Sequence, residues 1–219
     1  METKKRFAVI LAGCGHRDGA EITESVMALY AIARSGSTYE VFAPDKNQYH
    51  VINHLTGQPM KEERNIRVEV ARIARGKVSP LSDFNIKNFD ILMFAGGFGV
   101  AKNLCTYAFY GADCVVDPEI QKIIQSMHNA GKPIGALCIS PVLLASVLKH
   151  VNITMGQDKE AIANIEAMGA THQVTNPGEI VIDEENKIVT APCYMLDSDI
   201  VSIADENLLA VEALLKLAQ

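Results

Sequence analysis

Tryptophan is absent from this chain of 219 residues, and aromatic residues make up only 6% of it. Surfaces that bind single-stranded nucleic acid stack the bases on aromatic side chains, so this scarcity argues against such a surface. A basic excess is also lacking, because 20 lysines and arginines stand against 26 aspartates and glutamates and leave a net charge of −6. Nucleic acids and anionic membranes attract basic faces, so we expect neither as a partner.

An apolar run long enough to cross a membrane is missing as well. A membrane helix needs about 20 apolar residues, and the longest uncharged stretch, residues 133–148, is interrupted by Pro141. The first residues resemble a signal peptide, since Lys4, Lys5 and Arg6 precede an apolar segment, but no small-residue cleavage site follows. We interpret this segment as the first strand of a core.

Cysteine pairs are lacking too. The five cysteines are odd in number and contain no CxxC motif, a pattern typical of free thiols in a reducing compartment, which predicts a cytoplasmic protein. The histidines form no HExxH motif, so we expect no metal ion. No Walker lysine or GxGxxG fingerprint is present, and we expect no cofactor.

Strand-like apolar segments alternate with segments of helical periodicity along the chain. Strands are predicted at residues 6–12, 39–43, 89–95, 133–137 and 151–154, and helices at residues 20–35, 65–74, 117–128, 142–148, 159–168 and 204–217. Residues 179–183 and 187–191 predict a hairpin. This order is typical of an α/β fold, a three-layer sandwich of the flavodoxin type with a mostly parallel sheet and helices on both faces. We expect a single domain over residues 1–219.

Ligands of such sheets bind beyond the carboxyl ends of the strands. If the strands at residues 6–12, 89–95 and 133–137 are neighbours, the segments that follow them meet at one edge of the sheet. These segments are residues 13–24, residues 96–99 and Cys138.

Cys138 stands between a short apolar run and a segment that favours a helix, in the sequence Pro133-Ile-Gly-Ala-Leu-Cys-Ile-Ser-Pro. Strand, tight turn and helix in this order predict a nucleophile elbow, with cysteine in place of serine. Pro141 suits the first helical turn, and a thiol at a helix N-terminus tends toward the nucleophilic thiolate. Free cysteine is also among the residues most often buried in cores, so the segment alone leaves both interpretations open.

Two other features could serve such a cysteine. Gly96 and Gly97 follow a buried strand, and the N–H of Gly97 could form an oxyanion hole with that of Ile139. Taken alone, the two glycines favour an ordinary strand-ending turn over an oxyanion hole. Glu21 and Glu24 share one face of a helix start. Glu21 suits the helix dipole, whereas Glu24, one turn in, could share a proton with the sulfur.

Histidine is the usual base for a nucleophilic cysteine, but the residue after Cys138 is Ile139. His16 and His172 are more distant alternatives, both more simply explained as loop residues. Cys14 could also lie near the site. The other three cysteines (Cys105, Cys114, Cys193) we assign to packing or the surface.

These segments together resemble the DJ-1/PfpI superfamily, which has the class I glutamine-amidotransferase-like fold. The matching pieces are Ala8-Val-Ile-Leu-Ala, Asp18-Gly-Ala-Glu-Ile-Thr-Glu, Phe94-Ala-Gly-Gly-Phe-Gly and Gly135-Ala-Leu-Cys-Ile-Ser-Pro. Stretches such as Leu11-Ala-Gly-Cys-Gly, Ala71-Arg-Ile-Ala-Arg-Gly-Lys and Gly131-Lys-Pro-Ile-Gly resemble its ElbB branch, labelled glyoxalase or isoprenoid-biosynthesis protein with an amidotransferase-like domain.

The resemblance implies a nucleophilic Cys138, a partner carboxyl at Glu24 and oxyanion donors from the backbone of Gly97 and Ile139. Gly96, Glu21, Cys14 and His16 are expected to line the site. The resemblance also implies a homodimer and a cofactor-independent glyoxalase, a lyase that converts glyoxal or methylglyoxal to a 2-hydroxy acid without glutathione, which is related to protein deglycation. Two alternatives stay open: a cysteine-based redox sensor without turnover, and a cysteine amidohydrolase or peptidase. A role in isoprenoid metabolism rests on the label of the branch alone.

Overall fold

The structure, a computed structural model, describes residues 4–219. Its strands are β1 (Arg6–Ile10), β2 (Thr38–Ala43), β3 (Ser79–Pro80), β4 (Ile91–Phe94), β5 (Ile134–Leu137), β6 (Asn152–Ile153), β7 (Thr171–His172), β8 (Val181–Asp183) and β9 (Ile188–Ala191). Its α-helices are α1 (Ile22–Arg34), α2 (Ile66–Ile73), α3 (Tyr107–Tyr110), α4 (Pro118–Asn129), α5 (Pro141–Leu148), α6 (Lys159–Ala167) and α7 (Ile200–Leu217). Short turns of other helix types lie between them, among them η3 (Val100–Leu104) and η5 (Cys193–Met195).

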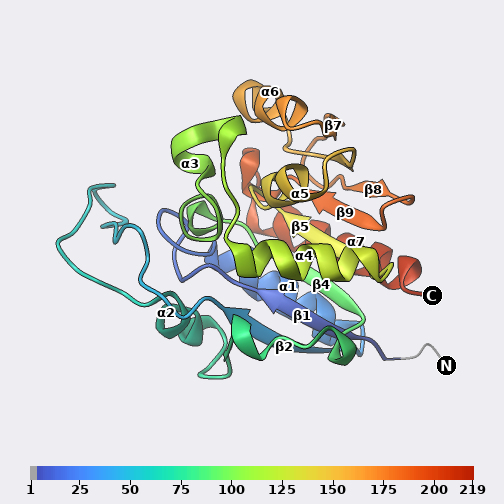
Figure 1. The fold of residues 1–219 in the computed structure, drawn as a ribbon, viewed down its shortest axis with the longest axis horizontal. Coiled ribbons are helices and arrows are strands. Elements are labelled where there is room, and N and C mark those ends of the chain that lie inside the picture. The colour runs from blue at the N-terminus through green and yellow to red at the C-terminus, as the bar shows by residue number, and fades with distance from the viewer. Residues whose placement is uncertain (1–3) are drawn as a thin grey trace.

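Seven strands form the main sheet in the order β3-β2-β1-β4-β5-β9-β8. All neighbours in it are parallel except β8 and β9, which form the predicted antiparallel hairpin. The predicted neighbours β1, β4 and β5 lie side by side in the middle (Figure 1). The flavodoxin-type α/β sandwich is therefore confirmed, and the segments after these three strands meet at one edge.

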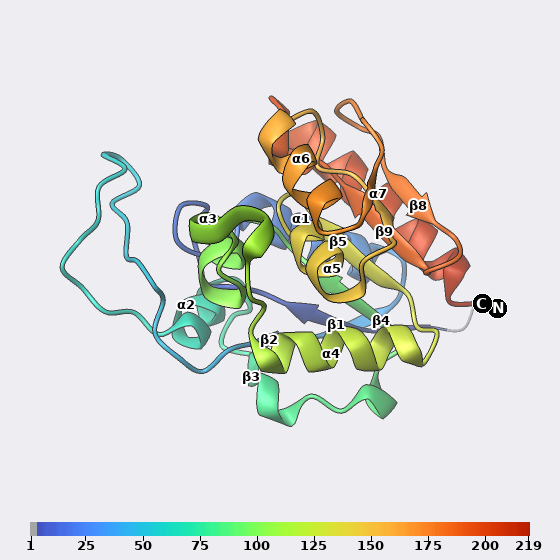
Figure 2. The same ribbon diagram turned by 45° about the horizontal axis from the view of Figure 1, so that its top comes forward.

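Apolar side chains fill both faces of the sheet because successive residues of a strand point to opposite sides. In β1, Ala8 and Ile10 join the core under α4, α5 and α6, whereas Phe7 and Val9 join the core under α1, α2 and α7. Figures 1 and 2 show these two sets of helices on opposite sides of the sheet. Continuous burial of the central strands β4 and β5 explains why their sequences are apolar throughout rather than alternating.

The last helix begins four residues earlier than the sequence predicted. The side chain of Asp199 accepts a hydrogen bond from the N–H of Ser202 at 2.8 Å, and this cap starts α7 at Ile200. Two exposed apolar residues, Ile200 and Val201, occupy the first turn and hide the helical periodicity there.

A long connection between β2 and α2 projects from the body of the molecule (Figures 1 and 2). It contains an isolated antiparallel bridge between Ile52 and Pro59, and Leu55 near its tip is 97% exposed.

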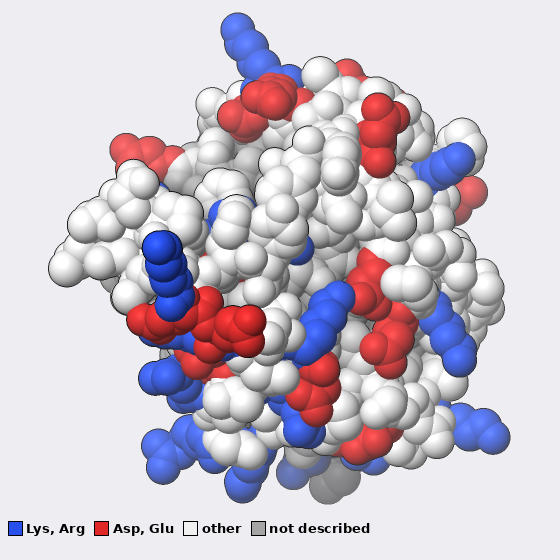
Figure 3. Space-filling view, turned by 60° about the vertical axis from the view of Figure 1, so that its left-hand side comes forward, with Lys and Arg blue, Asp and Glu red and all other residues white. Residues whose placement is uncertain are grey.

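On the face shown in Figure 3, acidic and basic side chains are interspersed. In the part of the chain that the structure describes, no helix combines the length and the apolar character that a bilayer crossing requires.

Candidate active site

The turn between β5 and α5 places Cys138 in a sharp backbone bend. Cys138 has a φ of +59°, in the left-handed region that strains any residue with a side chain. Its N–H donates to the carbonyl of Ala191 at 2.9 Å, and the hydroxyl of Ser140 donates to the carbonyl of Ala95 at 2.6 Å. Pro141 begins α5, as its missing N–H allows. The predicted nucleophile elbow is therefore present, and neighbouring strands hold it in place.

The two glutamates at the start of α1 have different surroundings. Glu21 caps the helix, since its Oε2 accepts a hydrogen bond from the N–H of Glu24 at 2.7 Å. Glu24 is fully buried, and its Oε2 accepts from the N–H of Gly96 at 3.1 Å while its Oε1 accepts from the N–H of Tyr194 at 3.2 Å. Its Oε2 also lies beside the thiol of Cys138, since a Cβ added at Gly96 would collide with both atoms. The structure thus brings together the predicted carboxyl and the predicted sulfur.

Burial controls the ionisation of both groups. Burial, and then the charge of Glu21, raise the pKa of Glu24 to about 8. Burial, and then the charge of Glu24, raise the pKa of Cys138 well above its usual range, whereas the N–H groups of Gly97 and Ile139 lower it. The expectation that the helix N-terminus alone would favour a thiolate is therefore corrected, because loss of solvent outweighs it. A thiolate forms here only while Glu24 keeps its proton, so the two groups titrate as a pair.

Two backbone donors face the sulfur, as expected for an oxyanion hole. The N–H groups of Gly97 and Ile139 both lower the pKa of the Cys138 thiol, as donors directed at its sulfur would. A Cβ at Gly96 would collide with the side chains of Cys138 and Glu24, so only glycine lets this strand end pass beside the pair. Gly97 has a φ of +97°, which also requires glycine. The glycine pair therefore also lets the backbone pass close to Cys138 and Glu24, in addition to ending the strand.

A small cavity of about 110 Å³ opens onto the sulfur. Its wall contains residues that the sequence placed at the site and others that it did not: His16, Glu21, Gly97, Phe98, Cys138, Ile139, Tyr194 and Met195. Cys14 does not belong to this wall, which corrects its expected place. Burial, and then the charge of Glu69, raise the pKa of the Cys14 thiol.

No histidine of residues 4–219 hydrogen-bonds to Cys138. His16 reaches the cavity, but its ring packs edge-on against His54, with 5.1 Å between ring centroids. His172 lies in β7, where its Nε2 accepts from the N–H of Met155 at 3.1 Å. A Cys-His-acid triad is therefore not assembled.

Metal ligands do not gather in residues 4–219: there, no group of three or more His, Cys, Asp or Glu side chains is placed to hold an ion. His50 and His54 have the four-residue spacing of a metal-binding helix, but this segment is an irregular loop. One nitrogen of His54 contacts the carbonyl of Ile52 at 3.0 Å, and the other accepts from the N–H of Arg17 at 3.3 Å.

Sequence reasoning missed Tyr194 and Met195 because no motif marks them. They follow β9, which runs parallel to β5 and ends at the same edge of the sheet. The rule that ligands bind beyond the carboxyl ends of strands would have found them if β9 had been placed beside β5. Cys193, assigned to packing or the surface, is fully buried next to them.

Comparison with known proteins found close relatives over most of the chain. The human protein "Glutamine amidotransferase-like class 1 domain-containing protein 3, mitochondrial" is 43% identical over 210 residues, which is 91% of this chain and 78% of that protein. The rat "ES1 protein homolog, mitochondrial" is 42% identical, over 92% of this chain and 80% of that protein. The zebrafish "ES1 protein, mitochondrial" is 32% identical, over 88% and 78%. No family model matches the chain.

Solved structures show the same fold. A protein from Ehrlichia chaffeensis described as an isoprenoid biosynthesis protein with an amidotransferase-like domain superposes with a TM-score of 0.92 at 35% identity, over 98% of this chain and 100% of that one. A ThiJ/PfpI domain protein from Brachyspira murdochii gives a TM-score of 0.59 at 17% identity, over 96% and 97%. A DJ-1 superfamily protein from Salmonella typhimurium gives 0.58 at 19%, over 95% and 89%. The two more distant structures support the fold alone.

The names of the curated relatives correct one expectation. All three are called mitochondrial, which contradicts the cytoplasmic location predicted from the cysteines. Free thiols indicate a reducing compartment without saying which one, so the cysteine pattern could not decide the question.

Proposed function

We propose a glutathione-independent glyoxalase activity for this chain, which belongs to the ES1 family of glutamine amidotransferase-like class 1 proteins within the DJ-1/PfpI superfamily. The superfamily includes enzymes, and the proposal concerns which reaction this member performs. One observation carries it: the buried Glu24 carboxyl lies beside the Cys138 thiol, next to the backbone N–H groups of Gly97 and Ile139 and a small cavity.

The size of the cavity supports a small substrate. A volume of about 110 Å³ lies well below the roughly 300 Å³ at which pockets begin to enclose drug-sized ligands. Glyoxal and methylglyoxal have few heavy atoms and suit such a space. The apolar side chains of Phe98, Ile139 and Met195 in its wall suit the methyl group of methylglyoxal.

The reaction begins in the form of the pair that has lost one of its two protons: the remaining proton passes from Cys138 to Glu24, and the resulting thiolate attacks the aldehyde carbon. A C–S bond forms, the carbonyl electrons move to the oxygen, and the N–H groups of Gly97 and Ile139 stabilise that oxyanion. Glu24 gives its proton to the oxygen, which yields a hemithioacetal and leaves a carboxylate beside it.

Glu24 then carries a proton between the two carbons. Its carboxylate takes the proton from the former aldehyde carbon, and the electrons move to the neighbouring carbonyl oxygen, which gives an enediolate. Glu24 then returns the proton to the neighbouring carbon, while the hydroxyl proton passes from the first oxygen to the second. The product of this step is the Cys138 thioester of a 2-hydroxy acid. Water cleaves the thioester, releases the acid and restores the thiol, so that one dicarbonyl and one water give one hydroxy acid.

The absence of a histidine contact to Cys138 within residues 4–219 separates this proposal from an amidase. An amide needs a strong acid for its leaving nitrogen, which histidine supplies in Cys-His enzymes. An aldehyde has no leaving group, so a single carboxyl suffices for its proton transfers. We therefore do not propose amide hydrolysis.

The test is formation of the 2-hydroxy acid from methylglyoxal in the absence of glutathione. We expect Cys138→Ala and Glu24→Gln to abolish it, and Cys14→Ala to leave it unchanged, because Cys14 does not line the cavity. Wild-type rates in either site variant would refute the proposal. Selective oxidation of Cys138 to a sulfinate by dilute peroxide, without any turnover, would favour the redox sensor instead.

A homodimer is also part of the proposal. Ile22, Val26 and Tyr30 on α1 are four residues apart in succession, so they share one helix face, and each is close to half exposed. An apolar stripe of this kind suits a contact between two copies. We expect sedimentation analysis to show a dimer that Val26→Glu converts to monomers; a wild-type monomer would exclude it.

A further inference from the structure

A second buried carboxyl contacts the turn that holds Glu24. Glu206 of α7 has no exposed surface, and its Oε2 accepts from the N–H of Cys193 at 2.7 Å while its Oε1 accepts from the N–H of Gly178 at 2.9 Å. Among residues 4–219 no salt bridge includes it. Burying a carboxyl without a cation is unfavourable unless its oxygens are hydrogen-bonded. An acid at this position therefore points to a specific task for its two oxygens.

The residue that Glu206 holds is under backbone strain. Cys193 has a φ of +46°, in the left-handed region, and is fully buried. A non-glycine residue keeps such a conformation only where its surroundings enforce it. Glu206 supplies one of these constraints, because its Oε2 accepts from the backbone N–H of Cys193.

The next residue connects this turn to the reacting pair. The N–H of Tyr194 donates to Oε1 of Glu24 at 3.2 Å, and the side chains of Tyr194 and Met195 line the cavity. Two consecutive backbone N–H groups, those of Cys193 and Tyr194, thus bind two different buried carboxyls. If Cys193 relaxes, the peptide unit that carries the Tyr194 N–H rotates with it.

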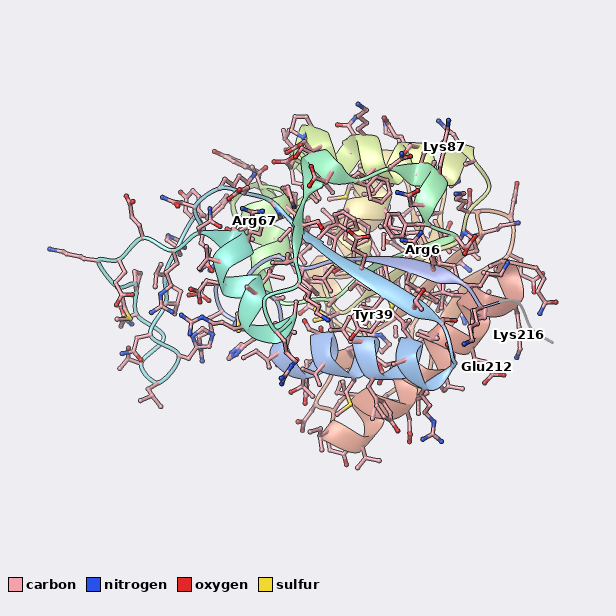
Figure 4. The ribbon with its side chains drawn as sticks, turned by 90° about the horizontal axis from the view of Figure 1, so that it is seen from below. Arg6, Tyr39, Arg67, Lys87, Glu212 and Lys216 are labelled. Carbon is pink, nitrogen blue, oxygen red and sulfur yellow. The ribbon has the colours of Figure 1, made fainter. Side chains whose placement is uncertain are left out.

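We propose that Glu206 is a positioning residue, which fixes the Cys193–Met195 turn so that the Tyr194 N–H stays on Glu24 and Glu24 stays on the Cys138 sulfur. The inference rests on the proposed function only in taking Glu24 and Cys138 as the reacting pair. Figure 4 shows α7 beside α1, and their apolar side chains share one core. The turn adds a second link between the two helices, through the backbone N–H groups of Cys193 and Tyr194. Without Glu206 the turn relaxes, and the pair loses one of the backbone donors that align it.

The cysteines of the chain provide the experiment. Each thiol is alkylated with iodoacetamide and followed by peptide mass spectrometry in the wild type, Glu206→Ala and Glu206→Gln. The matched control is Glu212→Gln, an exposed carboxyl paired with Lys216 on the same helix (Figure 4). Cys193 reports on the turn, Cys138 on the site, and Cys105, buried in the opposite core, on the fold.

In Glu206→Ala we expect Cys193 to react at least about tenfold faster and hydroxy-acid formation to fall at least about tenfold, while Cys105 stays protected. The rate of Cys138 alkylation should change together with that of Cys193. Glu206→Gln keeps an oxygen for the Cys193 N–H, so we expect it to retain most of the turnover. Unchanged alkylation of Cys193 and Cys138 in Glu206→Ala, with wild-type turnover, would overturn the proposal.

If Cys105 also reacts in Glu206→Ala, the variant has unfolded and Glu206→Gln decides. The proposal is supported if Glu206→Gln keeps a turnover near that of the wild type and its Cys193 stays protected from alkylation. It is overturned if the turnover of Glu206→Gln falls by more than about tenfold while Cys193 stays protected. A wild-type protein that forms no hydroxy acid would defeat the proposed function. In that case the alkylation pattern of Cys138 and Cys193 alone still decides the role of Glu206.

Discussion

Replacing Glu24 by glutamine should change how the stability of the protein depends on pH. Burial raises the pKa of Glu24 from 4.5 to about 8. The folded chain therefore binds this proton more tightly than the unfolded chain, and the free energy of unfolding falls as the pH rises from 4.5 to 8. At about 1.36 kcal/mol for each pKa unit, the shift corresponds to about 4–5 kcal/mol.

Glutamine cannot ionise, so Glu24→Gln should not lose this stability. We compare urea unfolding at pH 5, 6, 7 and 8. The free energy of unfolding of the variant, relative to that of the wild type, should rise by about 4 kcal/mol from pH 5 to pH 8. The exposed Glu212→Gln on α7 serves as the control and should follow the wild type at every pH. Parallel loss of stability in wild type and Glu24→Gln would mean that Glu24 ionises normally, and the reasoning about a shared proton would be refuted.

Three further predictions concern the same site. Activity should rise as the pH approaches about 8, because the pair must lose one of its two protons before it can hold a thiolate beside a protonated Glu24; a pH–rate profile that is flat from pH 6 to pH 8 would contradict this. Ser140→Ala leaves the buried carbonyl of Ala95 without its 2.6 Å donor, so we expect urea unfolding to show a loss of about 1–3 kcal/mol, and unchanged stability would mean the contact is dispensable. Gly96→Ala places a Cβ against Cys138 and Glu24, so it should abolish turnover while circular dichroism shows a folded chain; full activity would disprove the tight approach.

The fold was largely predictable because both faces of the sheet are covered. Burial on two sides makes strands such as β4 and β5 apolar throughout, and these runs stand out between amphipathic helices. The start of α7 was misplaced because its first turn is exposed and apolar, so the boundary depends on the Asp199 cap rather than on periodicity. Caps of a single residue are weak signals in a sequence.

The site was predictable where local geometry determines it. An apolar strand, a tight turn and a proline-started helix identify Cys138, and a position one turn into α1 identifies Glu24. Tyr194 and Glu206 were missed because their roles depend on β9 lying beside β5, a long-range pairing that no local pattern records. The ionisation of Cys138 was misjudged for the same reason, since burial by distant segments outweighs the nearby helix N-terminus.

The central claim is that the Cys138 sulfur adds to an aldehyde and that Glu24 moves the protons afterwards. Carbon-13 NMR of methylglyoxal labelled at the aldehyde carbon, mixed with Glu24→Gln, tests it most directly. We expect Glu24→Gln to show a tetrahedral hemithioacetal signal that persists, because the next proton transfer is blocked. The same variant that also carries Cys138→Ala should show no such signal. The claim is contradicted if the wild-type protein produces hydroxy acid but Glu24→Gln shows no such signal. It is also contradicted if the signal remains after Cys138 is replaced by alanine.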